Sequence, residues 1–191
     1  MILASGSTIR QELLRNAGLA VRAIPARIDE EMIRAALEAD GATPREIADA
    51  LAEAKARKIS LKDPAELTLG ADQVLEFEGR TISKSADMFA ARRLLTELRG
   101  KRHMLHAAAV LYREGRPLWR HIGTVQLTMR TFSDSYLDAY LHRNWPQVAG
   151  SVGAYHLEGE GLRLFSAVEG DYFNVLGLPM IQLLNHLALT G

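Results

Sequence analysis

The chain contains no cysteine, so disulfides, thiolate metal sites and cysteine nucleophiles are excluded. An excess of charge of either sign is also missing, because 23 basic side chains balance 23 acidic ones. A net charge of zero argues against nucleic-acid and membrane-surface partners, which select strongly basic chains. No stretch is apolar enough to span a bilayer, and the first residues lack a basic leader followed by an apolar run. We therefore expect a cytoplasmic protein with neither kind of partner.

The composition is otherwise that of an ordinary globular protein. The 191 residues suffice for a buried core, and hydrophobic residues make up 48% of them. Strand-like and helical stretches alternate unevenly along the chain, which predicts an α/β or α+β fold with a mixed sheet. We expect one domain that spans residues 1–191.

The start of the chain has the arrangement of an anion-binding turn. A short apolar strand, residues 1–4, is followed by a small polar loop and a helix predicted over 9–16, with Ser7 or Thr8 as its N-cap. This order aims backbone N–H groups and the positive end of a helix at an anion. Arg10 lies in the first turn, where a cation is unfavourable for the helix itself. A bound anion explains that placement, and an ordinary turn with a surface arginine explains it equally well.

A lysine interrupts the apolar face of a longer helix. The capping-box spacing of residues 43–46 predicts the start of this helix, which runs to residue 59 or 60. Ile47 and Leu51 lie on its apolar face, and Lys55 continues the same i, i+4 row. Lys55 therefore points inward, where it either extends its amine to solvent or meets a buried anion. The first outcome is the commoner one.

Residues 69–84 predict a β-hairpin around a turn at Glu78-Gly79. Asp72 is unusual there because aspartate is depleted in strands, and the small residues before it leave room for a ligand. A three-residue turn would place Lys84 diagonal to Asp72 on the same face, roughly 7–8 Å away. A two-residue turn would place it on the other face. An acid and a base that close could flank a metal-bound phosphate, whereas a solvated ion pair is the alternative.

Three other polar groups have both structural and functional interpretations. The acidic run 29–31 suits the start of a helix without any function, although one of its members could serve a metal. The glycine-rich stretch 149–161 suits a loop over a ligand or a plain surface loop. His103, His106 and His121 lack metal-ligand spacing on a helix, so we interpret them as structural.

The order of these features along the chain carries more information than any one of them. The blocks are Leu3-Ala4-Ser5-x-Ser7-x-x-Arg10-x-Glu12-Leu13-Leu14, Ile28-Asp29-Glu30, Ala54-Lys55-Ala56, Gly70-Ala71-Asp72, Lys84, Arg99-Gly100-x-x-His103, Gly153-Ala154-Tyr155-x-x-Glu158-Gly159 and Gly170-Asp171-Tyr172-x-x-Val175-x-Gly177-Leu178-Pro179. Together they resemble the Maf family over essentially the whole chain. Its members are cytoplasmic, metal-dependent nucleoside triphosphate pyrophosphatases. They cut between the α and β phosphates and release a nucleoside monophosphate and pyrophosphate.

The resemblance carries expectations about fold and partners. It implies an α/β fold in which a mixed β-sheet with flanking helices forms two lobes around a central nucleotide-binding cleft, as in inosine triphosphatases. It also implies Mg²⁺ or Mn²⁺ as cofactor, a nucleoside triphosphate as substrate and a homodimer. The whole chain, 1–191, would be a single Maf-like domain.

The same resemblance implies roles for individual residues. Asp72 would be the general base that activates water, or a metal ligand together with Glu30. Lys55 and Lys84 would neutralise phosphate charge during catalysis, and His103 would support the site. The expected phosphate contacts are Ser5, Ser7 and Arg10.

Three departures from the family pattern fall at positions that shape base selection. Ile9 stands where many members have an arginine, Gln73 where many have threonine, and Glu158 where many have glutamine. Gln73 with Glu158 is similar to the subgroup that prefers 7-methyl-GTP over dTTP and UTP. A carboxylate favours a cationic methylated guanine, or accepts hydrogen bonds from a guanine edge. That subgroup often carries an aromatic residue at the position of Ile9, and isoleucine cannot stack in the same way.

A second class of function stays open at this point. The chain could be a non-catalytic nucleotide-binding regulator of septum formation and cell division. The presence of Asp72, Lys55 and Lys84 together favours the enzyme, because a pure binder would not need all three.

Overall fold

A computed structural model describes residues 1–190, and within them the chain forms a seven-stranded mixed sheet. The strand order is β2-β1-β3-β5-β6-β7, with β4 added to β3. β1 pairs with β2 and β3 in parallel, and the other pairs are antiparallel. The strands are β1 Ile2–Leu3, β2 Arg22–Ala23, β3 Thr68–Phe77, β4 Arg80–Ile82, β5 Arg102–Arg113, β6 Arg116–Met129 and β7 Phe165–Glu169. The expected α/β fold with a mixed sheet and flanking helices is confirmed.

Side-chain caps mark the start of several of the described helices, and the sequence predicts two of these caps, at residue 7 or 8 and at residues 43–46. Ser7, Asp87 and Ser133 each accept a hydrogen bond from a backbone N–H of the first turn, and Thr43 forms a complete capping box. The α-helices are α1 Thr8–Asn16, α2 Glu30–Ala39, α3 Pro44–Ser60, α4 Met88–Leu98, α5 Asp134–Asn144, α6 Tyr172–Val175 and α7 Met180–Thr190. Two 3-10 helices are η1 Gln147–Gly150 and η2 Glu160–Leu164. η2 ends at Leu164, and β7 follows it directly at Phe165.

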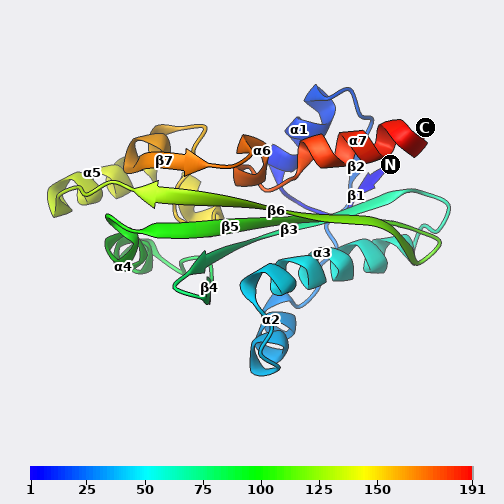
Figure 1. The fold of residues 1–191 in the computed structure, drawn as a ribbon, viewed down its shortest axis with the longest axis horizontal. Helices are drawn as coiled ribbons and strands as arrows, with labels where there is room; N and C mark the ends of the chain where they lie inside the picture. Colours follow the sequence, from blue (N-terminus) through cyan, green and yellow to red (C-terminus); the bar gives the residue numbers. More distant parts are fainter. Residues whose placement is uncertain (191) are drawn as a thin grey trace.

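Helices cover both faces of the long strands β3, β5 and β6, which cross the middle of the molecule (Figure 1). On one face α3 packs against Val74, Ala108, Val110 and Tyr112. On the other face α1 and the chain around α7 pack against one half of the strands, and α4 and α5 pack against the other half. The two halves of this second face therefore have separate cores.

A glycine lets α3 lie directly on β3. A Cβ added to Gly70 would sit 2.1 Å from the carbonyl oxygen of Ala52 and 2.6 Å from the backbone nitrogen of Ala56. These are backbone atoms, so no side-chain movement could relieve the collision. The close approach brings Lys55 of α3 beside Asp72 of β3.

One edge of β3 is interrupted at its centre. β1 pairs with Thr68 and Leu69, and β4 pairs with Leu75, Glu76 and Phe77. Both use the edge opposite β5, which pairs with β3 from Thr68 to Glu76. Between β1 and β4, residues 70–74 of β3 have no strand partner on this edge within the described part of the chain. Asp72 lies at the midpoint of this free edge.

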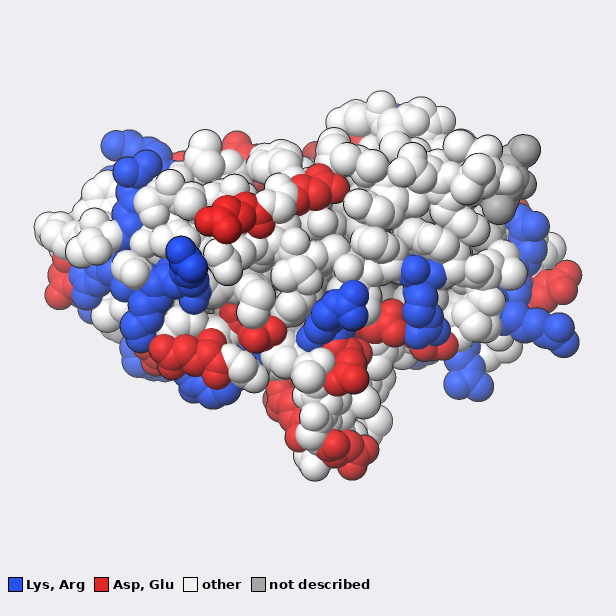
Figure 2. Space-filling model, in the orientation of Figure 1, with Lys and Arg blue, Asp and Glu red and all other residues white. Residues whose placement is uncertain are grey.

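The surface charge agrees with the balanced composition. Basic and acidic side chains are interspersed on the visible face, and acidic ones gather on the projecting α2 (Figure 2). No helix within residues 1–190 is both long and apolar enough to cross a membrane.

Candidate active site

A buried lysine joins two carboxylates at the free edge of β3. Lys55 Nζ lies 2.6 Å from Asp72 Oδ1 and 2.9 Å from Glu30 Oε1. Lys55 is 8% exposed and Asp72 is 6% exposed. The amine thus meets buried anions instead of extending to solvent, which confirms that Lys55 points inward. Because an unpaired buried charge is costly, the contact between the two groups offsets part of the cost of burying each of them.

Glu30 is the open member of this cluster. It is the first residue of α2, and 45% of its side chain is exposed. Burial alone would raise its pKa, but the hydrogen bond and charge of Lys55, with the charges of Lys84 and Arg34, hold the pKa below its ordinary value. Glu30 is therefore an ionised carboxylate that a cation can reach from solvent.

The hairpin has the two-residue turn. Phe77 pairs with Arg80, and Glu78 and Gly79 between them have φ of 51° and 76°, as such turns require. The three-residue alternative, which would set Lys84 diagonal to Asp72, is wrong. Lys84 follows the end of β4, is exposed, and acts on the cluster through its charge on Glu30. Of the two arrangements that the sequence left open, the one with Lys84 beside Asp72 is absent from the described residues, and Asp72 pairs with Lys55.

Arg10 fills the gap in the sheet. Its Nη1 donates to the carbonyl of Ala71 at 2.9 Å and to Ser5 Oγ at 3.3 Å, and its Nε donates to the carbonyl of Gly177 at 2.8 Å. Burial lowers the pKa of Arg10, while the charges of Asp72 and Glu30 oppose that shift. Only Nη2 forms no hydrogen bond within residues 1–190. Arg10 therefore mainly connects the first loop, β3 and the segment after α6, and its Nη2 is left to bind a ligand.

The loop before α1 is folded around two serines. Ser5 Oγ accepts from the backbone nitrogen of Ser7 at 3.2 Å, and Ser7 Oγ caps α1 by accepting from Arg10 N. The structure brings all three expected phosphate contacts together at the start of α1. Ile9, beside them, is half-buried.

Gln73 and Glu158 both lie near α6. Gln73 Nε2 donates to the carbonyls of Asn174 and Val175 at 2.8 and 2.9 Å. Glu158 is exposed between η1 and η2, and its charge adds to burial in raising the pKa of Tyr172, the first residue of α6. Gln73 of β3 and the loop that carries Glu158 are thus far apart in the sequence but both lie near α6.

His103 lies apart from this cluster. It is 3% exposed on β5, five residues from Ala108, the residue that pairs with Asp72. Side chains alternate along a strand, so an odd separation puts His103 on the opposite face. There its Nε2 lies 2.8 Å from the Tyr155 hydroxyl, and its ring packs against Tyr155 and Phe165. Any support that it gives to the site passes through the sheet.

The donors fit a divalent metal that is shared with a substrate. Within the described chain no group of three or more His, Cys, Asp or Glu side chains could hold a metal alone. The carboxylates of Asp72 and Glu30 do share one cation, Lys55. One or two carboxylates completed by substrate phosphates are the usual Mg²⁺ environment. The pair therefore suits Mg²⁺ or Mn²⁺ bound together with a nucleotide.

Sequence reasoning missed the role of the segment around α6. Its backbone carbonyls hold Arg10 and Gln73, and Asn174 packs against Gly123 of β6. The available signal was the stretch Gly170–Pro179, whose glycines and proline mark a tight, irregular segment. Side-chain patterns could not show that its backbone oxygens do the holding.

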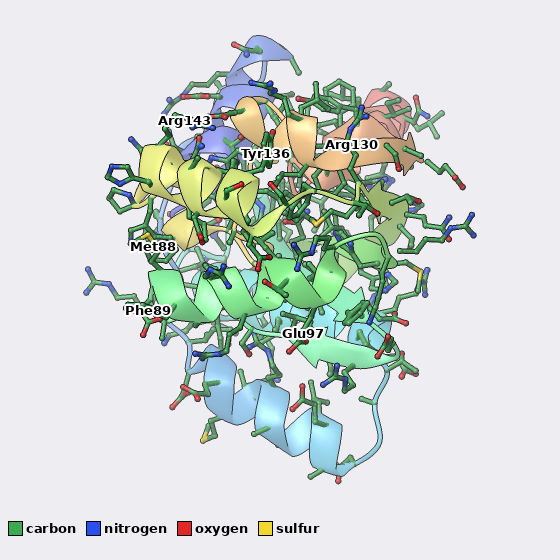
Figure 3. All side chains as sticks on the ribbon, turned by 90° about the vertical axis from the view of Figure 1, so that its left-hand side faces the viewer. Met88, Phe89, Glu97, Arg130, Tyr136 and Arg143 are labelled. Atoms are coloured by element: carbon green, nitrogen blue, oxygen red, sulfur yellow. The ribbon has the colours of Figure 1, made fainter. Side chains whose placement is uncertain are left out.

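A surface hollow lies at the end of β6, away from the cluster of Lys55, Asp72 and Glu30. It has a volume of about 370 Å³ and is lined by Arg130, Thr131, Phe132, Tyr136 and Arg163. Figure 3 looks onto this end of the molecule, where Arg130 and Tyr136 are labelled. Ile122 lies in the same cross-strand row as Asp72, eight residues before Arg130. At about 3.3 Å per residue the hollow is roughly 25 Å from the site.

Comparisons with known proteins agree with the resemblance. A family model described as Maf-like protein matches residues 1–190. A nucleoside triphosphate pyrophosphatase of Ruegeria sp. strain TM1040 is 58% identical over 100% of this chain and 96% of that protein. A 7-methyl-GTP pyrophosphatase of Mesorhizobium japonicum is 46% identical over the same shares. A solved HAM1 protein from Coxiella burnetii covers 85% of this chain and 93% of its own at 20% identity, with a TM-score of 0.40, too distant to inform function.

Proposed function

We propose that this chain, which belongs to the Maf-like protein family, is a nucleoside triphosphate pyrophosphatase. The reaction adds water across the α–β phosphate bond and gives a nucleoside monophosphate and pyrophosphate. The observation that carries the proposal is the contact of Lys55 with both Asp72 and Glu30 at the free edge of β3. The relatives at 45–58% identity, named as pyrophosphatases over the full chain, support it.

The chemistry follows from positioning and charge neutralisation, which are most of what phosphoryl transfer requires. Asp72 accepts the proton of the attacking water, and Lys55 holds that carboxylate in place through their 2.6 Å contact. Lys84 neutralises charge on the phosphates from the solvent side. The N-terminus of α1, with Ser5 and Ser7, binds phosphate oxygens through N–H and hydroxyl donors.

The metal is expected at the two carboxylates. Asp72 and Glu30 would hold Mg²⁺ or Mn²⁺ together with phosphate oxygens of the substrate. When bound, the ion supplies positive charge that stabilises the developing charge on the leaving pyrophosphate. Lys55 would then turn from the carboxylates toward the phosphates.

We further propose that the base is guanine-like, with 7-methyl-GTP as a candidate. Gln73 and Glu158 support this because both lie near α6, where a base could contact them together. Relatives named 7-methyl-GTP pyrophosphatase are 45% and 46% identical, while several more similar relatives carry the general name. A half-buried Ile9 offers no stacking ring, so selection would rest on the hydrogen-bonding edge.

Cytoplasmic location and a homodimer belong to the same proposal, because the family resemblance implies both. Size-exclusion chromatography with light scattering measures the oligomeric state directly. A monomer at enzyme concentrations that give full activity would remove the dimer from the proposal.

The test of the function is a substrate panel with Mg²⁺ or Mn²⁺. GTP, ATP, CTP, UTP, dTTP and 7-methyl-GTP are offered, and pyrophosphate and orthophosphate are detected separately. Release of pyrophosphate supports the proposal, and the ranking of bases identifies the substrate class. Orthophosphate alone would mean that a different bond is cut. Nucleotide binding without either product would favour the non-catalytic regulator of cell division.

A separate substitution, Glu158→Gln, tests the proposed preference for a guanine base. Glu158→Gln removes a charge at an exposed position, so we expect folding to be unaffected and the preference for guanine nucleotides to fall by about tenfold, the value of one charge-assisted hydrogen bond. An unaltered ranking of kcat/KM across the panel would exclude Glu158 from base selection.

A further inference from the structure

We infer that Asn174 is a positioning residue for base selection: it anchors α6 so that Gln73 can present only its amide oxygen to the substrate. This inference rests on the proposed function, because it concerns the base selection proposed for Gln73 and Glu158. It adds the direction in which Gln73 discriminates and the residue that enforces that direction.

The first step is the use of the Gln73 donors. A side-chain amide has two N–H donors on Nε2 and one oxygen acceptor. Nε2 donates to the carbonyls of Asn174 and Val175 at 2.8 and 2.9 Å, so both donors are in use. Within residues 1–190, Gln73 Oε1 forms no hydrogen bond. Turning the amide over would set its oxygen against two carbonyl oxygens and lose both bonds. Gln73 is therefore an acceptor toward any ligand.

The second step is the chemistry of the bases. Guanine carries adjacent N1–H and N2–H₂ donors on its Watson–Crick edge. Uracil and thymine carry one N–H between two carbonyl oxygens. Gln73 as a fixed acceptor, together with the carboxylate of Glu158 near the start of α6, matches the two guanine donors and leaves the pyrimidine oxygens facing acceptors. A site built for particular hydrogen bonds discriminates strongly against bases that lack them.

The third step is what holds α6 in place. α6 has four residues, too few for a helix to be stable by itself. Asn174 is 3% exposed, and its amide fills the space over Gly123, where an added Cβ would lie 2.2 Å from both Oδ1 and Nδ2. Gly123 pairs with Ala107, which pairs with Gln73. Asn174 therefore packs on the same cross-strand row of residues that contains Gln73.

A further observation separates Asn174 from an ordinary packing residue. Its Oδ1 is buried and has no hydrogen-bond partner among the described residues. An unpaired buried polar atom costs free energy, so filling the space over Gly123 does not by itself account for an asparagine at this position. The Asn174 side chain holds α6 against Gly123, and the backbone carbonyl of the same residue orients Gln73.

The experiment compares Asn174→Ala, Gln73→Ala and the double variant, with Asn144→Ala as a matched control. Asn144 is a half-buried asparagine of α5 that hydrogen-bonds to Tyr140 and Glu160, away from the site. The readout is the ratio of kcat/KM for GTP to that for UTP, and the same ratio of dissociation constants. Thermal melting checks that each variant is folded.

We expect Asn174→Ala to lower the GTP-to-UTP ratio by about tenfold, the value of one hydrogen bond. The double variant should match Gln73→Ala, because Asn174 acts through Gln73. Asn144→Ala should leave the ratio unchanged. Gly123→Ala, whose new Cβ displaces the Asn174 amide, should lower the ratio too, and it replaces Asn174→Ala if that variant does not fold.

An unchanged ratio in folded Asn174→Ala, with turnover intact, overturns the inference and leaves the proposed function standing. A double variant that falls well below Gln73→Ala overturns it too, because Asn174 would then act on the base independently. Absence of pyrophosphate release by the unmodified protein counts against the proposed function alone. The ratio of dissociation constants still tests Asn174 in that case.

Discussion

Two buried polar clusters lie on opposite faces of the same strands and differ in charge and in access. On one face Lys55, Asp72 and Glu30 form a charged set at the free edge of β3. On the other, His103 is enclosed by Tyr155 and Phe165, and burial lowers its pKa to about 4, so it is neutral at pH 7. The first cluster reaches solvent through Glu30, whose side chain is 45% exposed, while His103 is 3% exposed.

This difference between the two clusters shows that burial of a polar group is not enough to indicate a functional site. Burial of a polar group shows only that the group has a hydrogen-bond partner or is neutral. Both are true of His103, which contacts the Tyr155 hydroxyl and is neutral at pH 7. Ionised groups that are buried on one side and open on the other are suited to receive a charged ligand, because the ligand can replace one partner by another. The cluster of Lys55, Asp72 and Glu30 meets this condition, because Glu30 is open to solvent. His103 does not meet it, because it is enclosed.

The largest expected difference between the two clusters is in turnover. Asp72→Asn keeps the shape of the side chain but removes the proton acceptor, so turnover should fall by about 10²- to 10⁴-fold. Nucleotide binding should persist. The measurement is the initial rate of pyrophosphate release, set beside nucleotide binding by calorimetry.

His103→Gln is the matched variant on the opposite face. It should keep most of its turnover, since the ring is enclosed and contacts no residue of the first cluster in the described contacts. If His103→Gln lost as much turnover as Asp72→Asn while still folded, the contrast between the two clusters would fail.

The next effect concerns the contact that creates the charged cluster. Gly70→Ala places a Cβ 2.1 Å from the Ala52 carbonyl oxygen, so α3 must move away from β3. We expect a loss of about 1–3 kcal/mol in the free energy of unfolding, as for overpacked cores. Lys55 should also leave Asp72, with a fall in turnover. Urea denaturation and the pyrophosphate assay measure the two effects.

Gly150→Ala provides the control, because a Cβ there meets nothing within 4 Å and its φ is not positive. It should change neither quantity. Equal stability of the two variants would show that α3 does not depend on Gly70 for its approach.

Local signals in the sequence predicted much of this arrangement. The caps at Ser7 and Thr43, the inward direction of Lys55 and the strand around Asp72 follow from hydrogen-bonding and periodicity rules that act within a few residues. The resemblance to the Maf family, now confirmed over residues 1–190, added the order of the motifs.

Long-range placement could not be predicted in the same way. The partner of Asp72 is Lys55 rather than Lys84, because β4 ends at Ile82 and α3 brings Lys55 directly to Asp72. Turn length at Glu78-Gly79 was ambiguous from residue types. The backbone carbonyls around α6 that hold Arg10 and Gln73 leave no trace in side-chain patterns at all.

The smallest effect is the pH dependence that the enclosed histidine gives to stability. Its folded pKa of about 4 lies below the ordinary 6.5, so the unfolded chain binds the proton first. Stability attributable to His103 is therefore present above pH 6.5 and is lost as the pH falls toward 4, by at most about 3 kcal/mol. His103→Gln lacks this titration. Its deficit against the unmodified protein, measured by urea denaturation, should be larger at pH 7.5 than at pH 4.5. A deficit that stays constant between these pH values would mean that His103 is not held neutral by its enclosure, and the contrast with the charged cluster would rest on access alone.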